Sequence, residues 1–166
     1  MMTRAARVGP RGQPDASGIR VLLIDDEMEF AELYKHGLEI NGDQVRVAAD
    51  GITGLRLCRS WSPDLVLLDM KLALMDGPAL LRELRRSSDG KRIRVVALTN
   101  YTKSEVESAD PDLLGDLPWL LKLETTPHDL VRWIRSHLVL EEAGADGPAS
   151  QDCSMAARIG RSAGVS

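Results

Sequence analysis

The chain has 166 residues, of which 43% are hydrophobic and 28% are charged, a balance typical of a single globular domain. Its formal net charge of −4 argues against a nucleic-acid-binding surface, and no apolar run is long enough to span a membrane. The N-terminus lacks the apolar segment of a secretory signal, and Cys58 and Cys153 have neither a metal-ligand nor a redox spacing. We therefore expect a cytoplasmic protein with reduced thiols.

The two ends of the chain have no periodic pattern. Residues 1–18 are rich in Gly, Pro and Arg, and residues 141–166 are rich in small and polar residues. Such composition is typical of loose tails. We therefore predict flexible tails over residues 1–18 and 141–166 and one folded domain over residues 19–140, with no second folded unit after it.

Strands and helices alternate between the tails. Residues 19–24 predict an apolar strand, and a helix that ends at Asn41-Gly42 follows it. The apolar positions of this helix are Phe30, Leu33, Tyr34 and Leu38. Residues 44–48 alternate between polar and apolar, as an edge strand would. A second helix carries Ile52, Leu55 and Cys58 on one face and ends at Ser62-Pro63.

The second half of the chain continues this alternation. Residues 65–68, Leu-Val-Leu-Leu, predict a central strand, and Asp76 is placed to cap a third helix that has Pro78 in its first turn. A strand is predicted over residues 93–98, followed by a weak helix that Pro111 ends. A short strand over residues 119–121 and a last helix from Thr126-Pro127 complete the pattern.

Five consecutive strand–helix units predict a doubly wound α/β fold, a parallel sheet with helices on both faces. The strand order 2-1-3-4-5 places the edge-like second strand outside and puts a ligand site beyond the carboxyl ends of strands 1 and 3. The main alternative is an open Rossmann sheet. It would need glycines in the turn after strand 1, where this chain has Asp25-Asp26-Glu27.

Polar residues follow four of the predicted strands. Asp25 and Asp26 follow the first strand, Asp69 the third, Thr99 the fourth and Lys122 the fifth. Carboxylates gathered at one sheet edge repel one another unless a cation relieves them, and Mg²⁺ prefers such oxygen ligands. The pattern therefore predicts a magnesium site at which Asp69 can attack phosphorus while Thr99 and Lys122 contact phosphoryl oxygens.

Together these motifs resemble a two-component response regulator receiver domain over about residues 19–140. The resemblance rests on VLLIDDE, on ADG at Asp50-Gly51, on PDLVLLDM followed by MDG, on ALTN and on WLLK. It implies the flavodoxin-like fold of single-domain, chemotaxis-type receivers. It also implies a phosphorelay role, in which a histidine kinase or a phosphotransfer protein supplies the phosphoryl group.

The resemblance also implies roles for individual residues. Asp69 matches the phosphoacceptor, and Asp25 and Asp26 match the acidic pair that binds Mg²⁺ together with Asp69. Lys71 matches the position whose main-chain carbonyl completes this metal site.

Three further residues match the part of the family site that changes on phosphorylation. Thr99 matches the switch hydroxyl, Lys122 the lysine that contacts the phosphoryl group, and Trp119 the switch aromatic residue. The resemblance implies that phosphorylation changes the surface of the fourth helix, fifth strand and fifth helix. A downstream protein, which the sequence does not identify, would bind there.

Four residues depart from the family pattern. Ala73 replaces a usual proline, so the loop after Asp69 should be less rigid. Leu123 replaces a proline with a cis bond, so the bond between Lys122 and Leu123 should be trans, and this could re-aim Lys122. Asn100 could crowd entry of the phosphodonor. The side chain of Lys71 could shield the acyl phosphate or pair with Asp69.

Two other functions compete with a phosphorylated receiver. A pseudo-receiver, a binding module that acts without regulatory phosphorylation, is favoured by Leu123 and Asn100 and opposed by the complete set of site residues. A magnesium-dependent phosphatase or phosphotransferase of the haloacid-dehalogenase type would carry a second aspartate where this chain has Lys71. We therefore expect a protein that catalyses only its own phosphorylation and dephosphorylation, with no membrane or nucleic-acid partner.

Overall fold

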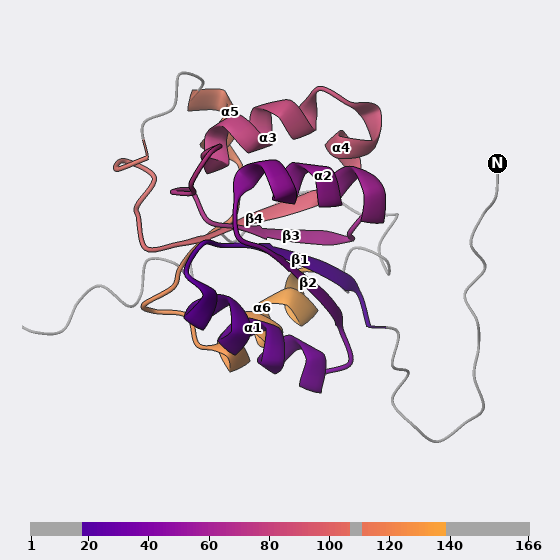
Figure 1. The fold of residues 1–166 in the computed structure, drawn as a ribbon. Coiled ribbons are helices and arrows are strands. Elements are labelled where there is room, and N and C mark those ends of the chain that lie inside the picture. The colour runs from indigo at the N-terminus through magenta and orange to yellow at the C-terminus, as the bar shows by residue number, and fades with distance from the viewer. Residues whose placement is uncertain (1–17, 107–110, 139–166) are drawn as a thin grey trace, which may run out of the picture. The chain divides into compact units, whose positions relative to one another are not determined.

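Five parallel strands form one sheet in the order β2-β1-β3-β4-β5 in the computed structural model, which describes residues 18–106 and 111–138 (Figure 1). The strands are β1 (Arg20–Ile24), β2 (Gln44–Ala48), β3 (Leu65–Leu68), β4 (Arg94–Thr99) and β5 (Trp119–Leu121). The helices are α1 (Met28–Ile40), α2 (Gly51–Trp61), α3 (Gly77–Arg85), α4 (Ser88–Arg92), α5 (Pro111–Gly115) and α6 (Pro127–Leu138). The predicted doubly wound, flavodoxin-like fold is confirmed.

The chain divides into two units, residues 1–133 and residues 134–166. Of the second unit, the structure describes only the last part of α6. The two predicted tails and Cys153 lie outside the described residues, apart from Gly18. Within the described stretches, no helix combines the length and the apolar character needed to cross a membrane.

The strand register explains why the central strands are apolar on both faces. Ile24 at the end of β1 lies opposite Ala48 of β2 on one side and Leu68 of β3 on the other. All four residues of β3 are fully buried, whereas β2 alternates between exposed and half-buried positions before Ala48. A strand covered on both faces must be apolar throughout, and an edge strand need not be, as the sequence pattern predicted.

Helices cover both faces of the sheet in the first unit. In Figure 1, α2, α3, α4 and α5 lie on one side of the sheet, and α1 and the beginning of α6 lie on the other. On this second side the two helices approach closely: a Cβ atom added at Gly37 of α1 would lie 2.7 Å from Cβ of Pro127. Leu130 and Val131 of α6 are buried there. The free cysteine Cys58 is buried on the opposite side, and burial raises its pKa to about 11.

The predicted cap of α3 is present, and α6, which was predicted to start at Thr126-Pro127, is capped as well. Asp76 Oδ1 accepts a hydrogen bond from the amide of Ala79, 2.8 Å away, and Pro78 occupies the first turn of α3. At the start of α6, the hydroxyl of Thr126 accepts from the amide of Asp129, and the Asp129 carboxylate accepts from the amide of Thr126. These reciprocal bonds satisfy amides that have no partner within the helix.

The prediction of a helix ending at Pro111 is wrong for the residues that the structure describes. Residues 103–105 form a turn, and Pro111 begins the short helix α5 instead of ending one. The Glu105 carboxylate accepts from both the amide and the hydroxyl of Thr102, and these bonds join the two ends of the turn. Proline suits the first position of a helix because its missing amide hydrogen is not needed there.

The sequence pattern also missed one helix and misplaced two side chains. α4 was not predicted; Ser87 caps it by accepting from the amide of Gly90. Leu33 and Ile52, which were assigned to the apolar faces of α1 and α2, are each 53% exposed. Ala31 takes the buried position in α1, because a small side chain fits where the helix lies close to the sheet.

Candidate functional site

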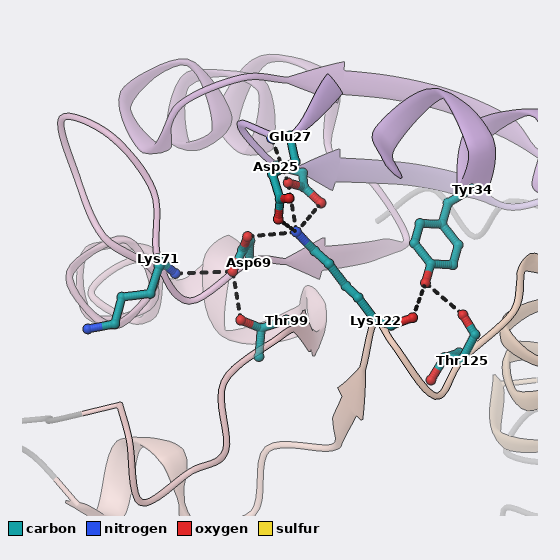
Figure 2. Close-up of polar contacts among 8 residues, drawn as sticks. All are labelled: Asp25, Glu27, Tyr34, Asp69, Lys71, Thr99, Lys122 and Thr125. Atoms are coloured by element: carbon teal, nitrogen blue, oxygen red, sulfur yellow. Dashed lines mark hydrogen bonds and ion pairs between the residues drawn. The ribbon is translucent and has the colours of Figure 1, made fainter. Parts of the chain in front are cut away.

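The backbone of neighbouring strands holds three of the predicted site residues at one edge of the sheet. The amide of Asp25 donates to Ala48 O, that of Asp69 to Ile24 O and that of Lys122 to Thr99 O, at 2.9, 2.9 and 3.0 Å. The ladder of parallel hydrogen bonds therefore extends one residue past the strands. The backbone of these residues is therefore held by the sheet, and their side chains converge (Figure 2).

Lys122 lies among three carboxylates. Its ammonium nitrogen is 2.8 Å from Asp25 Oδ2, 2.8 Å from Asp69 Oδ2 and 3.0 Å from Glu27 Oε1. Lys122, Asp25 and Asp69 are buried, whereas about half of the Glu27 side chain is exposed. The predicted convergence of Asp25, Asp69 and Lys122 is thus present, and the trans bond after Lys122 does not turn its side chain away.

Burial and ion pairing act in opposite directions on this cluster. Burial alone would lower the pKa of Lys122, but hydrogen bonds to Asp25, Asp69 and Glu27 outweigh it and raise the pKa above its usual value. Burial is also the main influence on Asp25, whose pKa is raised although Lys122 and the amide of Glu27 favour its charged form. Lys122 therefore stays a cation at neutral pH.

Asp69 is oriented by three hydrogen-bond donors. Its Oδ1 accepts from the hydroxyl of Thr99 at 2.7 Å and from the amide of Lys71 at 3.1 Å, and its Oδ2 accepts from Lys122 at 2.8 Å. The side chain is only 4% exposed. A carboxylate fixed in this way is pre-organised, because little reorientation is needed before it reacts.

The carboxylates of Asp25, Glu27 and Asp69 fit a divalent cation. One oxygen from each lies within 4.8 Å of the others, and with the ammonium of Lys122 the three groups carry a formal charge of −2. Hard oxygen ligands of this kind suit Mg²⁺. Glu27 was not among the predicted ligands, although it stands in the same Asp-Asp-Glu turn and its amide donates to Asp25 Oδ1.

Asp26 is exposed and does not belong to this group of three carboxylates. Its role in binding magnesium therefore stays a prediction, as does that of the main-chain carbonyl of Lys71.

The suggested pairing of the Lys71 side chain with Asp69 is wrong: the side chain extends away from Asp69 (Figure 2), and its ammonium lies 5.6 Å from the ring centre of Tyr101. The hydrogen bond between Lys71 and Asp69 is made by the Lys71 amide. Asn100 is exposed.

Trp119 is half-buried and packs against the core cluster that includes Leu81 of α3 and Leu114 of α5. Its indole nitrogen donates to the carbonyl of Tyr101 at 2.7 Å, and the ammonium of Lys103 lies 5.8 Å from its ring centre. Trp119 is therefore tied to the loop that follows Thr99. Its role as a switch residue stays a prediction.

The sheet order and the acidic site at its carboxyl edge define a receiver-type α/β protein. Residues 21–110 match the family model of the response regulator receiver domain. The chain therefore belongs to the response regulator receiver domain family of two-component systems. Domains of this family interact with histidine kinases or phosphotransfer proteins, and they bind Mg²⁺ in an acidic pocket.

Sequence relatives include the response regulator MprA of Mycobacterium sp. (strain KMS), which is 30% identical over 133 residues, 79% of this chain and 56% of that protein. Its counterpart in Mycolicibacterium vanbaalenii is 32% identical over 106 residues, 64% of this chain and 46% of that protein. The chain thus spans about half the length of these curated relatives.

Solved structures of similar fold include the chemotaxis response regulator CheY4 of Vibrio cholerae, at 25% identity and a TM-score of 0.64, covering 72% of this chain and 98% of that one. A CheY-like receiver domain from Methanospirillum hungatei is 28% identical with a TM-score of 0.65, covering 76% and 98%. The receiver domain of a sensor histidine kinase from Pseudomonas aeruginosa, which has magnesium in its active-site cleft, is 25% identical with a TM-score of 0.61, covering 72% and 97%.

Proposed function

We propose that Asp69 accepts a phosphoryl group from a histidine kinase or a phosphotransfer protein, and that the chain signals through protein contacts. The observation that carries this proposal is the buried Asp69 carboxylate held between the hydroxyl of Thr99 and the ammonium of Lys122. Both groups are placed to donate hydrogen bonds to phosphoryl oxygens once a phosphoryl group is attached to Asp69, and such bonds stabilise its negative charge.

In the proposed reaction, an oxygen of Asp69 attacks the phosphorus atom of a phosphohistidine. A phosphorus–oxygen bond forms and the phosphorus–nitrogen bond breaks, and its electron pair stays on the imidazole nitrogen, which takes up a proton. Lys122 and Thr99 then donate to the phosphoryl oxygens. Asp25, Asp69 and Glu27, with Asp26 and the Lys71 carbonyl as further predicted ligands, would hold Mg²⁺, which neutralises charge on these oxygens when bound.

The hydroxyl of Thr99 is the proposed start of the conformational response. It donates to Asp69 now, and a phosphoryl oxygen on Asp69 would offer it a stronger acceptor. Tyr101, two residues further, holds the indole of Trp119 through its carbonyl. A shift of Thr99 would therefore favour a second position of Trp119 and alter the surface of α5, β5 and residues 127–133 of α6, where a downstream protein would bind.

On this proposal the protein works in the cytoplasm and catalyses only its own phosphorylation and dephosphorylation. The absence of a DNA-binding output domain stays a prediction. The second candidate, a pseudo-receiver, is favoured by one observation: the ammonium of Lys122 already pairs with all three carboxylates. Mg²⁺ would have to compete with that ammonium for the same oxygens.

The test is to incubate the protein with Mg²⁺ and acetyl phosphate and to measure its intact mass and tryptophan fluorescence. We expect one phosphoryl adduct, lost in Asp69→Asn and retained in Asp89→Asn, which changes an exposed aspartate of α4. Trp119→Phe identifies the source of any fluorescence change. A folded wild-type protein that gives no adduct would overturn the proposal in favour of the pseudo-receiver, and continuous release of phosphate from many donors would favour an enzyme.

A further inference from the structure

The loop between β5 and α6 carries Lys122 at its first position. The amide of Lys122 is held by Thr99 O across the sheet, but the chain beyond it leaves the sheet at once. Leu123 is 80% exposed and Glu124 is exposed. Within the loop, the amide of Thr125 reaches the Lys122 carbonyl only at 3.4 Å, a weak bond by length. A turn bond of 3.0 Å from the amide of Glu124 to Leu121 O also spans Lys122, so the group that the loop holds only weakly is the Lys122 carbonyl.

Tyr34 supplies this restraint from α1. Its hydroxyl lies 2.7 Å from the carbonyl oxygen of Thr125 and 3.2 Å from that of Lys122, so one donor bridges the two ends of the loop (Figure 2). Tyr34 is separated from these residues by about ninety positions in sequence and is 1% exposed. Burial raises the pKa of Tyr34, so its hydroxyl keeps the proton that it donates.

The helix that carries Tyr34 also follows the acidic turn. α1 begins directly after Glu27, and the amide of Ala31, the fourth residue of this helix, donates to Glu27 O. Tyr34 therefore connects the turn that holds Asp25 and Glu27 to the loop that holds Lys122. A lysine side chain has several freely rotating bonds, so its ammonium reaches a defined point only if its backbone is fixed.

We propose that Tyr34 is a positioning residue for Lys122: its hydroxyl clamps the carbonyls of Lys122 and Thr125, so that the ammonium is presented to Asp69 during phosphoryl transfer. This inference rests on the proposed function. Tyr34 touches neither Asp69 nor the phosphoryl group, so it acts only through Lys122. A purely structural role would instead be to satisfy two carbonyls of the loop, with no consequence specific to Lys122.

The experiment is a double-mutant cycle on the rate of phosphorylation by acetyl phosphate. The variants are Tyr34→Phe, Lys122→Met and the two combined, and each rate is divided by the folded fraction measured by near-UV circular dichroism. We expect Tyr34→Phe to slow the reaction about tenfold or more in the wild-type background, because small misplacements of a reacting group are costly. In the Lys122→Met background it should have no further effect.

The control is Leu38→Val, which disturbs the packing of α1 one turn further along the same buried face and leaves the two Tyr34 hydrogen bonds to the loop in place. It should leave the normalised rate unchanged. Equal slowing by Tyr34→Phe in both backgrounds, or no slowing in either, would overturn the positioning role. Because wild type is measured first, a wild type that forms no adduct overturns the proposed function as well, and a reactive wild type that Tyr34→Phe leaves unaffected overturns this inference alone.

Discussion

Lys122 is the residue on which the charge balance of the site depends. Its ammonium is the cation that lies within 3.0 Å of the carboxylates of Asp25, Asp69 and Glu27. Two of these carboxylates are buried, where an unpaired charge is costly. The same ammonium that stabilises the metal-free protein therefore also competes with Mg²⁺ for those oxygens.

Replacing Lys122 by methionine should destabilise the metal-free protein and strengthen magnesium binding. We expect a loss of about 3 kcal/mol in the free energy of unfolding, because two buried carboxylates lose their cation. Urea unfolding with and without Mg²⁺ measures this, and Mg²⁺ should stabilise the variant more than wild type. Lys35→Met, which removes an exposed pair with Glu32, should change stability by less than about 0.5 kcal/mol. Equal effects of the two variants would contradict the prediction.

The geometry of the site and the family resemblance predict different ligands for Mg²⁺. The geometry places Glu27 among the candidate ligands, and the family resemblance assigns Asp26. We expect Glu27→Gln to raise the dissociation constant for Mg²⁺ about tenfold, because changes in and around a metal site commonly weaken binding by this amount. Titration calorimetry on Glu27→Gln, Asp26→Asn and the control Glu29→Gln measures this. If only Asp26→Asn weakens binding, Glu27 serves Lys122 alone.

At the scale of elements, helix α3 sets the position of the loop after Asp69. A Cβ atom added at Gly77, its first residue, would lie 2.7 Å from Met70 Cα and 2.8 Å from Asp69 O, so the helix begins in direct contact with the acceptor segment. The cap at Asp76 fixes where this helix starts. The start of α3 is thus coupled to the site without any side chain from the helix entering it.

The contribution of the Asp76 cap to α3 can be tested directly. Asp76→Ala removes the acceptor for the amide of Ala79 and should cost about 1 kcal/mol in the free energy of unfolding, whereas Asp76→Asn keeps a good capping group. Thermal and urea unfolding of both variants measure the difference. Similar losses in both would mean that the charge of Asp76, and not its hydrogen bond, supports α3.

For the molecule as a whole, the proposed phosphorylation at the end of β3 would have to change the surface near the neighbouring strands β4 and β5. Thr99 ends β4, and Trp119 begins β5, which pairs with β4 through Ala97. The bond from the Trp119 indole to Tyr101 O adds a second connection through the loop after Thr99. We therefore expect a change at Asp69 to reach the surface through Thr99 and Tyr101.

Thr99→Ala should separate phosphorylation from this response. We expect the variant to form the adduct, more slowly than wild type, without the Trp119 fluorescence change, because the hydroxyl that moves toward the phosphoryl group is gone. Thr99→Ser keeps a hydroxyl and should retain the change. Mass spectrometry and fluorescence on the same samples measure both events. A full fluorescence change in Thr99→Ala would show that the signal takes another route.

Much of the site was predictable because it depends on chain order. Apolar strands followed by Asp25, Asp69, Thr99 and Lys122 predicted both the sheet and the edge at which these residues meet, since parallel strands end on the same side. The apolar run of β3, the cap of α3 and the start of α6 at Thr126-Pro127 were equally local signals. Composition and spacing therefore determined the fold class and most of the residues at the site.

Tertiary structure alone decided the remaining contacts. Glu27 joins the cluster because Lys122 reaches it across 95 positions in sequence, the side chain of Lys71 turns to Tyr101, and Tyr34 bonds to a loop about ninety positions away. The start of α5 at Pro111 likewise departed from the local pattern. Such contacts depend on where side chains point after the elements pack, and spacing along the chain carries no record of that direction.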